Sequence, residues 1–306
     1  MRLSQPWLYI QVSVVAVCCV YCKQEKLLFT TANNIQEIDL DTLVVKELAY
    51  QSTESHSIAY DEKERYVYSS RLAENTIVRF PYPNDQAVNF ETVVSTNRPY
   101  YVAFDSGNSH LYWTELNTLG RVVRCKSDGW IYYSTETSNA LLRVTFDGTE
   151  RQVVINLSSR LIDIQVDFVD QRVYWMEYDT GDLKSVLNNG SDVKTVMSTY
   201  VKLYNREIDI GGDYIFYTSY KNILKVHKSS GQMPTVVHTE QVQIDGLLFY
   251  KLKGEKYKFR NACWEFLFDD IKSTSRRQGR NEDGSQEGHK YSLHNCGINQ
   301  TSEMEA

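Results

Sequence analysis

Six histidines are the side chains of this chain that are best suited to acid–base catalysis or metal binding near neutral pH. A zinc hydrolase would show His-Glu-x-x-His, a serine hydrolase Gly-x-Ser-x-Gly, and a calcium loop regularly spaced acidic residues. None of these patterns occurs in the sequence. The histidines also share no repeated position: His56, His110, His227, His238, His289 and His294. We therefore expect no enzymatic activity, no catalytic residue, no metal site and no cofactor.

The cysteines give no metal-binding pattern either, and the N-terminus indicates secretion. Arg2 is followed by an apolar run from about Trp7 to Cys22 that is too short to cross a bilayer. Residues 1–22 are therefore predicted to be a cleaved signal peptide, with an uncleaved anchor as the alternative. The pattern places the cleavage point only within the range from Ala16 to Cys22. At most four cysteines then remain, without a Cys-x-x-Cys pair: Cys22, Cys125, Cys263 and Cys296. Three Asn-x-Ser/Thr triplets agree with an extracellular glycoprotein: Asn156, Asn189 and Asn299.

Charge and composition exclude some classes of partner. The chain has 306 residues, is 42% hydrophobic and carries a net charge of -6. Its 33 basic residues form no run along one segment, so the electrostatic footprint of a nucleic-acid-binding protein is missing. We expect no nucleic-acid partner and no membrane span in the mature chain.

The remaining distinctive residues are aromatic. They recur in short, similar sequence segments, here called phrases, which indicates a repeated structural element that places them. The clearest copies are LYWTE at 111–115, IYYST at 131–135 and VYWME at 173–177. An apolar stretch that ends in Asp precedes most copies, and a Gly follows about sixteen residues after the anchor. The anchors are spaced by 40, 44, 20, 42 and 42 residues: Leu28, Tyr68, Tyr112, Tyr132, Tyr174 and Phe216.

Each unit is written in short alternating apolar runs separated by turn residues, such as Asp147-Gly148 and Asn189-Gly190. No useful helical period appears. A unit of about 42 residues with four short strands is typical of a propeller blade, because a lone sheet must stack on neighbours to bury its faces. Six anchors therefore predict an all-β propeller with six blades.

The spacing of 20 residues between Tyr112 and Tyr132 is 22 residues short of a normal unit, which corresponds to two strands and their loops. After the Gly129 landmark, the next aromatic strand begins at once with Trp130. We interpret this stretch as two adjacent blades joined by an internal deletion between Gly129 and Trp130. A functional ring that is two strands short is the alternative, and we expect that such a ring would have two incomplete blades.

LYWTE and VYWME, with the preceding Asp and the following Gly, resemble the YWTD repeats of low-density lipoprotein receptor class B modules. The resemblance covers residues 24 to 263 and implies a six-bladed YWTD propeller. Only Trp113 and Trp175 keep the motif tryptophan, and no copy ends in Asp. Successive aromatic residues on a strand point to opposite faces of a blade, so Tyr112, Trp113, Tyr174 and Trp175 are predicted to lie in the core.

The two ends of the repeat region predict how the ring closes. The first unit, KLLFTTANNI, has no preceding Asp-ending strand, while VQIDGLLFYK at 242–251 has no aromatic strand after it. We expect 244–251 to pair beside 26–31, because joining the chain ends in one blade removes the open edges of the ring.

The resemblance also implies a ligand-binding face. In the family, protein segments dock on loops that precede the first strand of a blade or follow the aromatic motif. The matching positions include tyrosines and arginines, which are typical of interface hot spots. The predicted ligand-binding face consists of Glu54, Glu74, Arg98, Glu136, Arg160, Tyr178, Asp179 and Tyr220.

These observations favour an extracellular protein-binding module of a low-density lipoprotein receptor-related type, a relative of receptors in Wnt signalling or in lipoprotein endocytosis. A nidogen-like basement-membrane linker is the alternative, and a calcium-dependent lactonase-type enzyme is a third hypothesis. An extracellular protein ligand is the expected partner, with a co-receptor or parent receptor as a further one. We divide the chain into the signal peptide (1–22), the YWTD propeller (23–263) and a polar tail (264–306) that we expect to be disordered. We expect a secreted fragment or isoform of a receptor-like protein.

Overall fold

The computed structural model describes residues 24–251, apart from 52, 85, 117–120, 126–128, 136–137, 147, 200–204 and 230. The chain divides into two compact units, Met1–Lys253 and Gly254–Ala306, and the described residues all belong to the first. The predicted signal peptide and polar tail, with Asn299, lie outside the described residues.

The described strands form six antiparallel sheets, which we number as blades 1 to 6 along the chain. Blade 1 consists of β22 (Ile244–Lys251), β1 (Glu25–Thr31), β2 (Asn34–Asp39) and β3 (Val45–Tyr50). Blade 2 consists of β4 (Ile58–Asp61), β5 (Tyr66–Arg71), β6 (Thr76–Pro81) and β7 (Glu91–Ser95). Among the described strands, blade 3 has only β8 (Pro99–Asp105) and β9 (His110–Glu115).

The second half of the ring is complete. Blade 4 consists of β10 (Arg121–Cys125), β11 (Trp130–Thr135), β12 (Ser138–Thr145) and β13 (Arg151–Asn156). Blade 5 consists of β14 (Leu161–Asp167), β15 (Arg172–Glu177), β16 (Asp182–Leu187) and β17 (Lys194–Ser198). Blade 6 consists of β18 (Asn205–Gly211), β19 (Tyr214–Ser219), β20 (Asn222–His227) and β21 (Thr235–Thr239).

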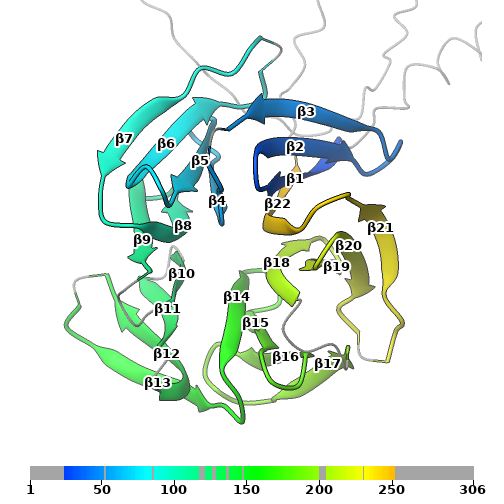
Figure 1. Cartoon of the computed structure of the whole chain (residues 1–306). Helices are drawn as coiled ribbons and strands as arrows, with labels where there is room; N and C mark the ends of the chain where they lie inside the picture. The colour runs from blue at the N-terminus through cyan, green and yellow to red at the C-terminus, as the bar shows by residue number, and fades with distance from the viewer. Residues whose placement is uncertain are drawn as a thin grey trace, which may run out of the picture. The chain divides into compact units, whose positions relative to one another are not determined.

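The blades are arranged around a ring, with the first strand of each on the inside (Figure 1). Each inner strand contacts the inner strand of the next blade, in the order β22, β4, β8, β10, β14 and β18 and back to β22. This arrangement confirms the predicted all-β propeller. Within the described part of the chain, no helix has the length and apolar character needed to span a bilayer.

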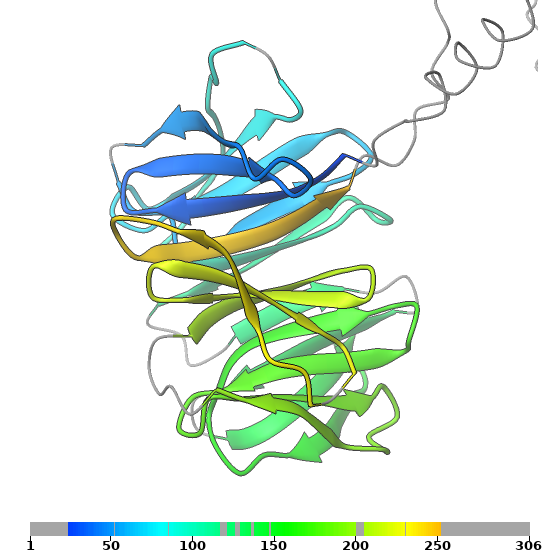
Figure 2. The ribbon, with the colours of Figure 1, turned by 90° about the vertical axis from the view of Figure 1, so that its right-hand side faces the viewer.

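The predicted ring closure is confirmed. β22 pairs antiparallel with β1, with Glu25 opposite Lys251 and Leu28 opposite Leu248. The two strands run side by side in both views of the ring (Figures 1 and 2). The buried hydroxyl of Thr30 accepts a hydrogen bond from the Gly246 amide at 2.7 Å. The first and last described strands therefore complete one blade.

The structure corrects the prediction that the 22-residue shortfall leaves two blades incomplete. β10 pairs with β11 and is the inner strand of blade 4, so blade 4 has all four of its strands. Only blade 3 is therefore short. The physical reason is ring closure: six inner strands must contact one another around the ring, whereas a missing outer pair leaves that ring intact.

Apolar clusters fill the interfaces between blades. Trp175 packs with Tyr132 and Leu141 of blade 4, while Tyr174 packs with Ile208 and other residues of blade 6. The two neighbouring rings of the VYWME phrase therefore point to opposite faces of blade 5. They are 2% (Tyr174) and 1% (Trp175) exposed.

The same phrase in blade 3 is less buried. Trp113 packs against a cluster with Tyr68 and Ile77 of blade 2, but both Tyr112 and Trp113 are only partly buried. The prediction that all four motif aromatics lie in the core is therefore corrected at Tyr112 and Trp113. Blade 3 has no described third or fourth strand to cover them.

Candidate functional site

The predicted ligand-binding residues that the structure describes lie at one end of the ring, which we call the loop face. It consists of the residues that directly precede the inner strands and the residues that directly follow the second strands. Because neighbouring strands in each blade are antiparallel, the start of the first strand and the end of the second strand meet at this end. The loop face thus brings together segments that are about 18 residues apart in sequence, such as Arg160 and Tyr178.

Blade 5 contains the best-ordered group of predicted residues. The Arg160 guanidinium lies over the Tyr178 ring, 4.2 Å from its centre, and the Tyr178 amide donates to the Arg160 carbonyl at 2.8 Å. The Ser159 hydroxyl donates to the Asp179 carboxylate at 2.9 Å, and the Asp179 amide donates back to Ser159 at 3.0 Å. Arg160 and Asp179 are exposed, whereas Tyr178 is half-buried against the core of the blade.

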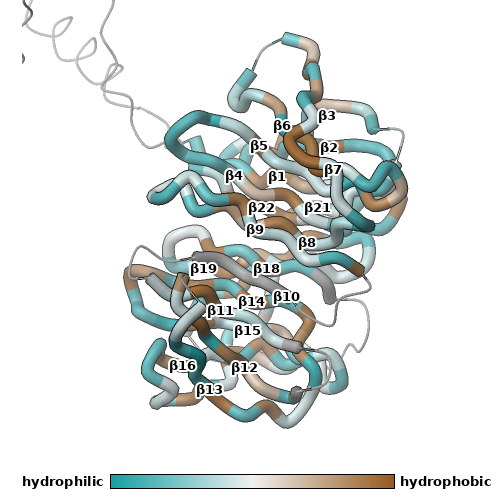
Figure 3. Tube along the Cα trace, turned by 90° about the vertical axis from the view of Figure 1, so that its left-hand side faces the viewer, coloured by the Kyte–Doolittle hydropathy of each residue, from teal (hydrophilic) through white to brown (hydrophobic). Residues whose placement is uncertain are grey.

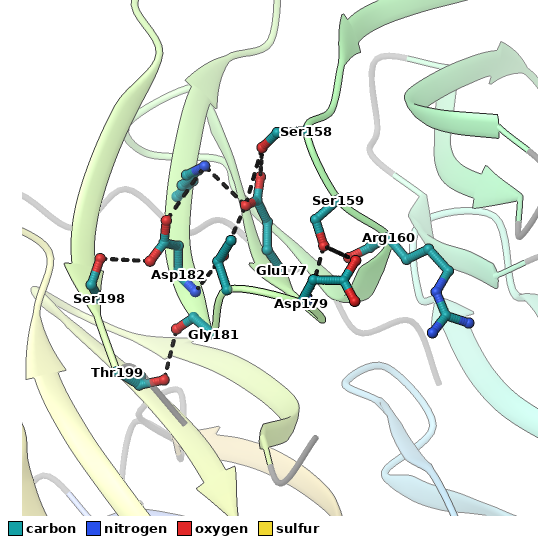
Figure 4. A network of polar contacts seen from close by, with 11 residues as sticks. Ser158, Ser159, Arg160, Glu177, Asp179, Gly181, Asp182, Ser198 and Thr199 are labelled. Carbon is teal, nitrogen blue, oxygen red and sulfur yellow. Dashed lines mark hydrogen bonds and ion pairs between the residues drawn. The ribbon is translucent and has the colours of Figure 1, made fainter. Parts of the chain in front are cut away.

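The buried carboxylate of Glu177 holds the loops next to this group through hydrogen bonds and an ion pair. Glu177, which ends the VYWME phrase, is 1% exposed and accepts hydrogen bonds from the hydroxyls of Ser158 and Thr180 at 3.1 and 3.0 Å. It also forms an ion pair with Lys184 at 2.9 Å. Figure 4 shows Glu177 at the centre of this network, beside the Ser159–Asp179 pair. The network fixes the loops that carry Arg160 and Tyr178 to the same strand end.

Blade 3 repeats part of this arrangement. The Leu116 amide donates to the Arg98 carbonyl at 3.0 Å, the same contact that Tyr178 makes with Arg160. Arg98 is exposed and has a positive φ of 46°, and its amide donates to the Asn75 side chain of blade 2 at 2.8 Å. The loops of blades 2 and 3 are therefore joined through Asn75.

The predicted acidic residues of blade 2 have separate partners. Glu74 pairs with Arg71 at 2.9 Å and accepts a hydrogen bond from Thr53 at 3.3 Å. Glu54 lies 3.5 Å from the His56 ring nitrogen. In blade 6, Tyr220 is 45% exposed, and the Lys221 ammonium lies 5.5 Å from its ring centre.

The structure brings only some of the predicted residues into contact. Arg160, Tyr178 and Asp179 form one group. The other described residues have separate local partners: Glu54, Glu74, Arg98 and Tyr220. Glu136 lies outside the described residues. The predicted glycosylation positions Asn156 and Asn189 are exposed.

The sequence analysis missed two residues beside the loop face, one before β4 and one at the start of β8. The rings of His56 and Tyr100 stack with centres 4.6 Å apart and so join blades 2 and 3. Both lie two residues after a predicted position, Glu54 and Arg98 respectively. Alignment of the units at these offsets would have placed the two rings at equivalent positions in neighbouring blades, which was the available signal.

A second feature that the sequence analysis missed is a small cavity of about 60 Å³ between the inner strands. Its polar lining includes Asp163, Gln165, Glu207 and Asp209. The Asp163 and Asp209 carboxylates accept hydrogen bonds from the backbone amides of neighbouring inner strands, at 2.8 Å from Ile208 and 2.6 Å from Phe249. These carboxylates therefore tie blades together. Among the described residues, no group of three or more His, Cys, Asp or Glu is placed to hold a metal ion.

Comparison with known proteins found limited similarity in sequence. No model of a protein family matches the chain. Low-density lipoprotein receptor-related protein 5 from Mus musculus is 26% identical over 119 residues, and the Homo sapiens protein of that name is 25% identical over 119 residues. In each case the match covers 38% of this chain and 7% of the relative, so the chain spans a small part of these proteins.

Comparison with solved structures gave a match to a crystal structure of the nidogen/laminin complex. The TM-score is 0.43 and the sequence identity is 14%. The match covers 74% of this chain and 98% of the other chain.

Proposed function

We propose that this chain, which is similar in its repeats to the YWTD propellers of low-density lipoprotein receptor-related proteins, is an extracellular module that binds a protein ligand on its loop face. The proposal extends to a role in Wnt signalling or in endocytic uptake of lipoproteins. Arg160, Tyr178 and Asp179 form the centre of the proposed site.

The observation that carries the proposal is the pre-ordered group on blade 5. Tyr178 presents an aromatic ring held by Arg160 on one side and by the core on the other, and Asp179 is held by Ser159. Such a group offers an apolar surface, a cation and an anion at little cost in side-chain entropy on binding, because the side chains are already fixed. Tyrosine and arginine are also the residue types that contribute most to protein interfaces.

We further propose that the protein is not an enzyme. Two carboxylates that line the inner cavity accept hydrogen bonds from backbone amides, Asp163 from Ile208 and Asp209 from Phe249. A carboxylate in such contacts serves to fix inner strands. A general base would have to direct a free oxygen atom toward a substrate.

The test measures binding of the secreted chain to purified Wnt antagonists, to lipoprotein particles and to laminin by surface plasmon resonance. For a true ligand, Tyr178→Ala is expected to weaken binding by about 2 kcal/mol, or roughly thirtyfold. Tyr214→Ala is the matched control. Tyr214 is 40% exposed, and the Lys225 ammonium lies 4.6 Å from its ring centre. It is the first residue of β19 and therefore lies at the end of blade 6 that is opposite to the loop face. Tyr214→Ala should leave binding unchanged.

The outcomes separate the hypotheses. Selective binding of laminin would favour the nidogen-like linker over a receptor-type module. Equal losses from both tyrosine variants would reject the loop face as the site. Calcium-dependent hydrolysis of ester or lactone substrates would overturn the proposal that the protein is not an enzyme.

A further inference from the structure

Blade 3 leaves an open strand edge in the ring. β9 pairs with β8 on one side, and no described strand pairs with it on the other. Figure 3 faces this side of the ring and shows β8 and β9 running side by side. An unpaired edge presents backbone amides and carbonyls that can pair with another extended chain. The feature lies on the perimeter of the ring and is separate from the loop face.

The other five blades show what kind of strand fits beside β9. In each, the third strand carries an apolar residue followed three positions later by a second one. The odd spacing sends the two side chains to opposite faces of the blade. The pairs are Ile35 and Ile38, Ile77 and Phe80, Leu141 and Val144, Leu183 and Val186, and Ile223 and Val226. All of these are buried except Val144, which is partly buried.

Blade 5 gives the register, because its second strand carries the phrase most similar to that of β9. Val186 lies opposite Val173, and Leu183 lies opposite Met176. In an alignment of the two phrases, Leu111 matches Val173 and Thr114 matches Met176. In a strand added beside β9, the first apolar residue would therefore lie opposite Thr114 and the second opposite Leu111. Leu111 already packs with Trp113 and Val94 against blade 2, and this cluster is only partly covered.

We propose that the outer edge of β9 binds an extended segment of a partner protein by strand addition. The segment carries an apolar residue followed three positions later by a second, so that it supplies the third strand of blade 3. Its second apolar side chain completes the cluster of Leu111, Trp113 and Val94. The backbone pairs give affinity, and the two apolar side chains give specificity.

The position of β9 favours a slender segment over a second copy of this chain. Blades 2 and 4 on either side each keep a third and a fourth strand. Strands lie about 4.8 Å apart in a sheet, so these blades reach about 10 Å farther out along their own directions than β9 does. In Figure 1, β7 and β13 lie farther from the centre of the ring than β9. A single extended strand enters such a recess more readily than another folded ring.

The probe is a fluorescein-labelled peptide with the sequence TGDLKSVLNN, which copies residues 180–189 of this chain. We expect saturable binding to the secreted chain by fluorescence anisotropy. A control peptide with Asn in place of the residues that match Leu183 and Val186 should bind at least about tenfold more weakly, because two buried apolar side chains are lost. Peptides N-methylated at either set of alternate residues test the backbone pairing. Only one set should abolish binding, since only alternate amides face β9.

Variants of the chain locate the site. Leu111→Asn should weaken peptide binding about tenfold, whereas Val153→Asn, at a 58% exposed position of β13 in a complete blade, should not. Thermal melting controls for folding of each variant. Tyr178→Ala should leave peptide binding unchanged, so failure of this inference and failure of the proposed function are distinguishable.

Equal binding of the parent and Asn-substituted peptides would overturn the inference, as would undiminished binding by both N-methylated peptides. Analytical ultracentrifugation tests the alternative that a second copy of the chain occupies the edge. A dimer that is lost in Leu111→Asn and is not dissociated by the peptide would favour that alternative and would also overturn the inference.

Discussion

Blade 5 and blade 3 carry nearly the same phrase, VYWME and LYWTE, on their second strands, yet its aromatic residues have different surroundings. Trp175 is 1% exposed between blades 4 and 5, whereas Trp113 is only partly buried between blades 2 and 3. In the part of the chain that the structure describes, blade 5 has four strands and blade 3 has two. The difference teaches that the phrase supplies rings to both faces of a strand, while the outer strands determine how far those rings are covered.

The polar part of the phrase behaves differently, because its partner is local. Ser158 donates to Glu177 in blade 5, and Thr96 donates to Glu115 in blade 3. Each hydroxyl lies nine residues before the Asp that ends the inner strand, Asp167 or Asp105. The contact needs only the first two strands of a blade. The hydrogen bond between hydroxyl and carboxylate is therefore present in blade 3 as well, although the aromatic residues of that blade are less buried than those of blade 5.

The largest expected effect tests apolar burial. Trp175→Ala should lower the free energy of unfolding by about 3–5 kcal/mol, because it leaves a cavity between two blades. Trp113→Ala should lower it by about 1–2 kcal/mol, because less apolar surface is buried there. Urea unfolding followed by circular dichroism measures both values. Equal losses would mean that blade 3 is as fully covered as blade 5.

The next effect concerns the two glutamates. Glu177→Gln should destabilise the fold by about 2 kcal/mol, because it removes a buried ion pair with Lys184 and weakens two hydrogen bonds. Glu115→Gln should cost about 0.5–1 kcal/mol, since this position is more open. The same urea titration gives both values. A larger loss at Glu115 would contradict the difference in burial.

A third effect depends on pH. Burial opposes ionisation of Asp167, but hydrogen bonds from Lys228 and from the amides of Val169 and Asp170 outweigh it and hold its pKa below the usual range. A lowered pKa in the folded state adds stability above the unfolded pKa, and this stability is lost as the pH falls below about 4. Asp167→Asn should therefore cost about 1 kcal/mol at pH 7 and flatten the acid limb of the stability curve.

Asp105 provides the matched control for this prediction. It occupies the same place in blade 3, and its carboxylate accepts hydrogen bonds from the Gly107 amide and from Asn108 at 2.9 and 2.7 Å. Asp105→Asn should cost less at pH 7 than Asp167→Asn. An unchanged acid limb in Asp167→Asn would show that the Lys228 contact between blades 5 and 6 is not the source of the pH dependence.

The smallest effects concern the arginines of the loop face and have opposite signs. Arg160→Ala should destabilise by about 0.5 kcal/mol through loss of the contact with the Tyr178 ring. Arg98→Gly should stabilise by about 0.5 kcal/mol, because Arg98 has a positive φ that glycine adopts without strain. Differential scanning calorimetry resolves the two signs. A destabilised Arg98→Gly would indicate side-chain contacts for Arg98 that outweigh its backbone strain.

Much of the fold follows from local patterns that are readable in the sequence. The Asn-Gly turn at 189–190 is an example, because Gly190 has a positive φ of 87° in the turn between β16 and β17. The structure adds a second reason for glycine there, since a Cβ would lie 2.5 Å from the Val154 carbonyl oxygen of blade 4. Turn chemistry was therefore predictable, whereas the close approach of two blades was not.

The candidate site was predictable in part for the same reason. Repeat alignment placed Arg160, Tyr178 and Asp179 at the same end of one blade, because two antiparallel strands fix that proximity. It did not predict that Tyr178 is half-buried, or that His56 stacks on Tyr100 across two blades. These contacts depend on how neighbouring blades pack, and no short segment contains that information.

The sequence by itself determined the repeated units, the short strands within them and the closure of the ring through β22 and β1. Each of these follows from local alternation, turn residues or the pairing of two incomplete ends. Only the tertiary structure decided which blade lacks its outer strands. The edge of β10 had two possible partners, β9 and β11, and the choice of β11 keeps six inner strands in contact around the ring. That choice left Trp113 partly buried and the edge of β9 open, because strand pairing is a competition among distant segments that the whole ring resolves.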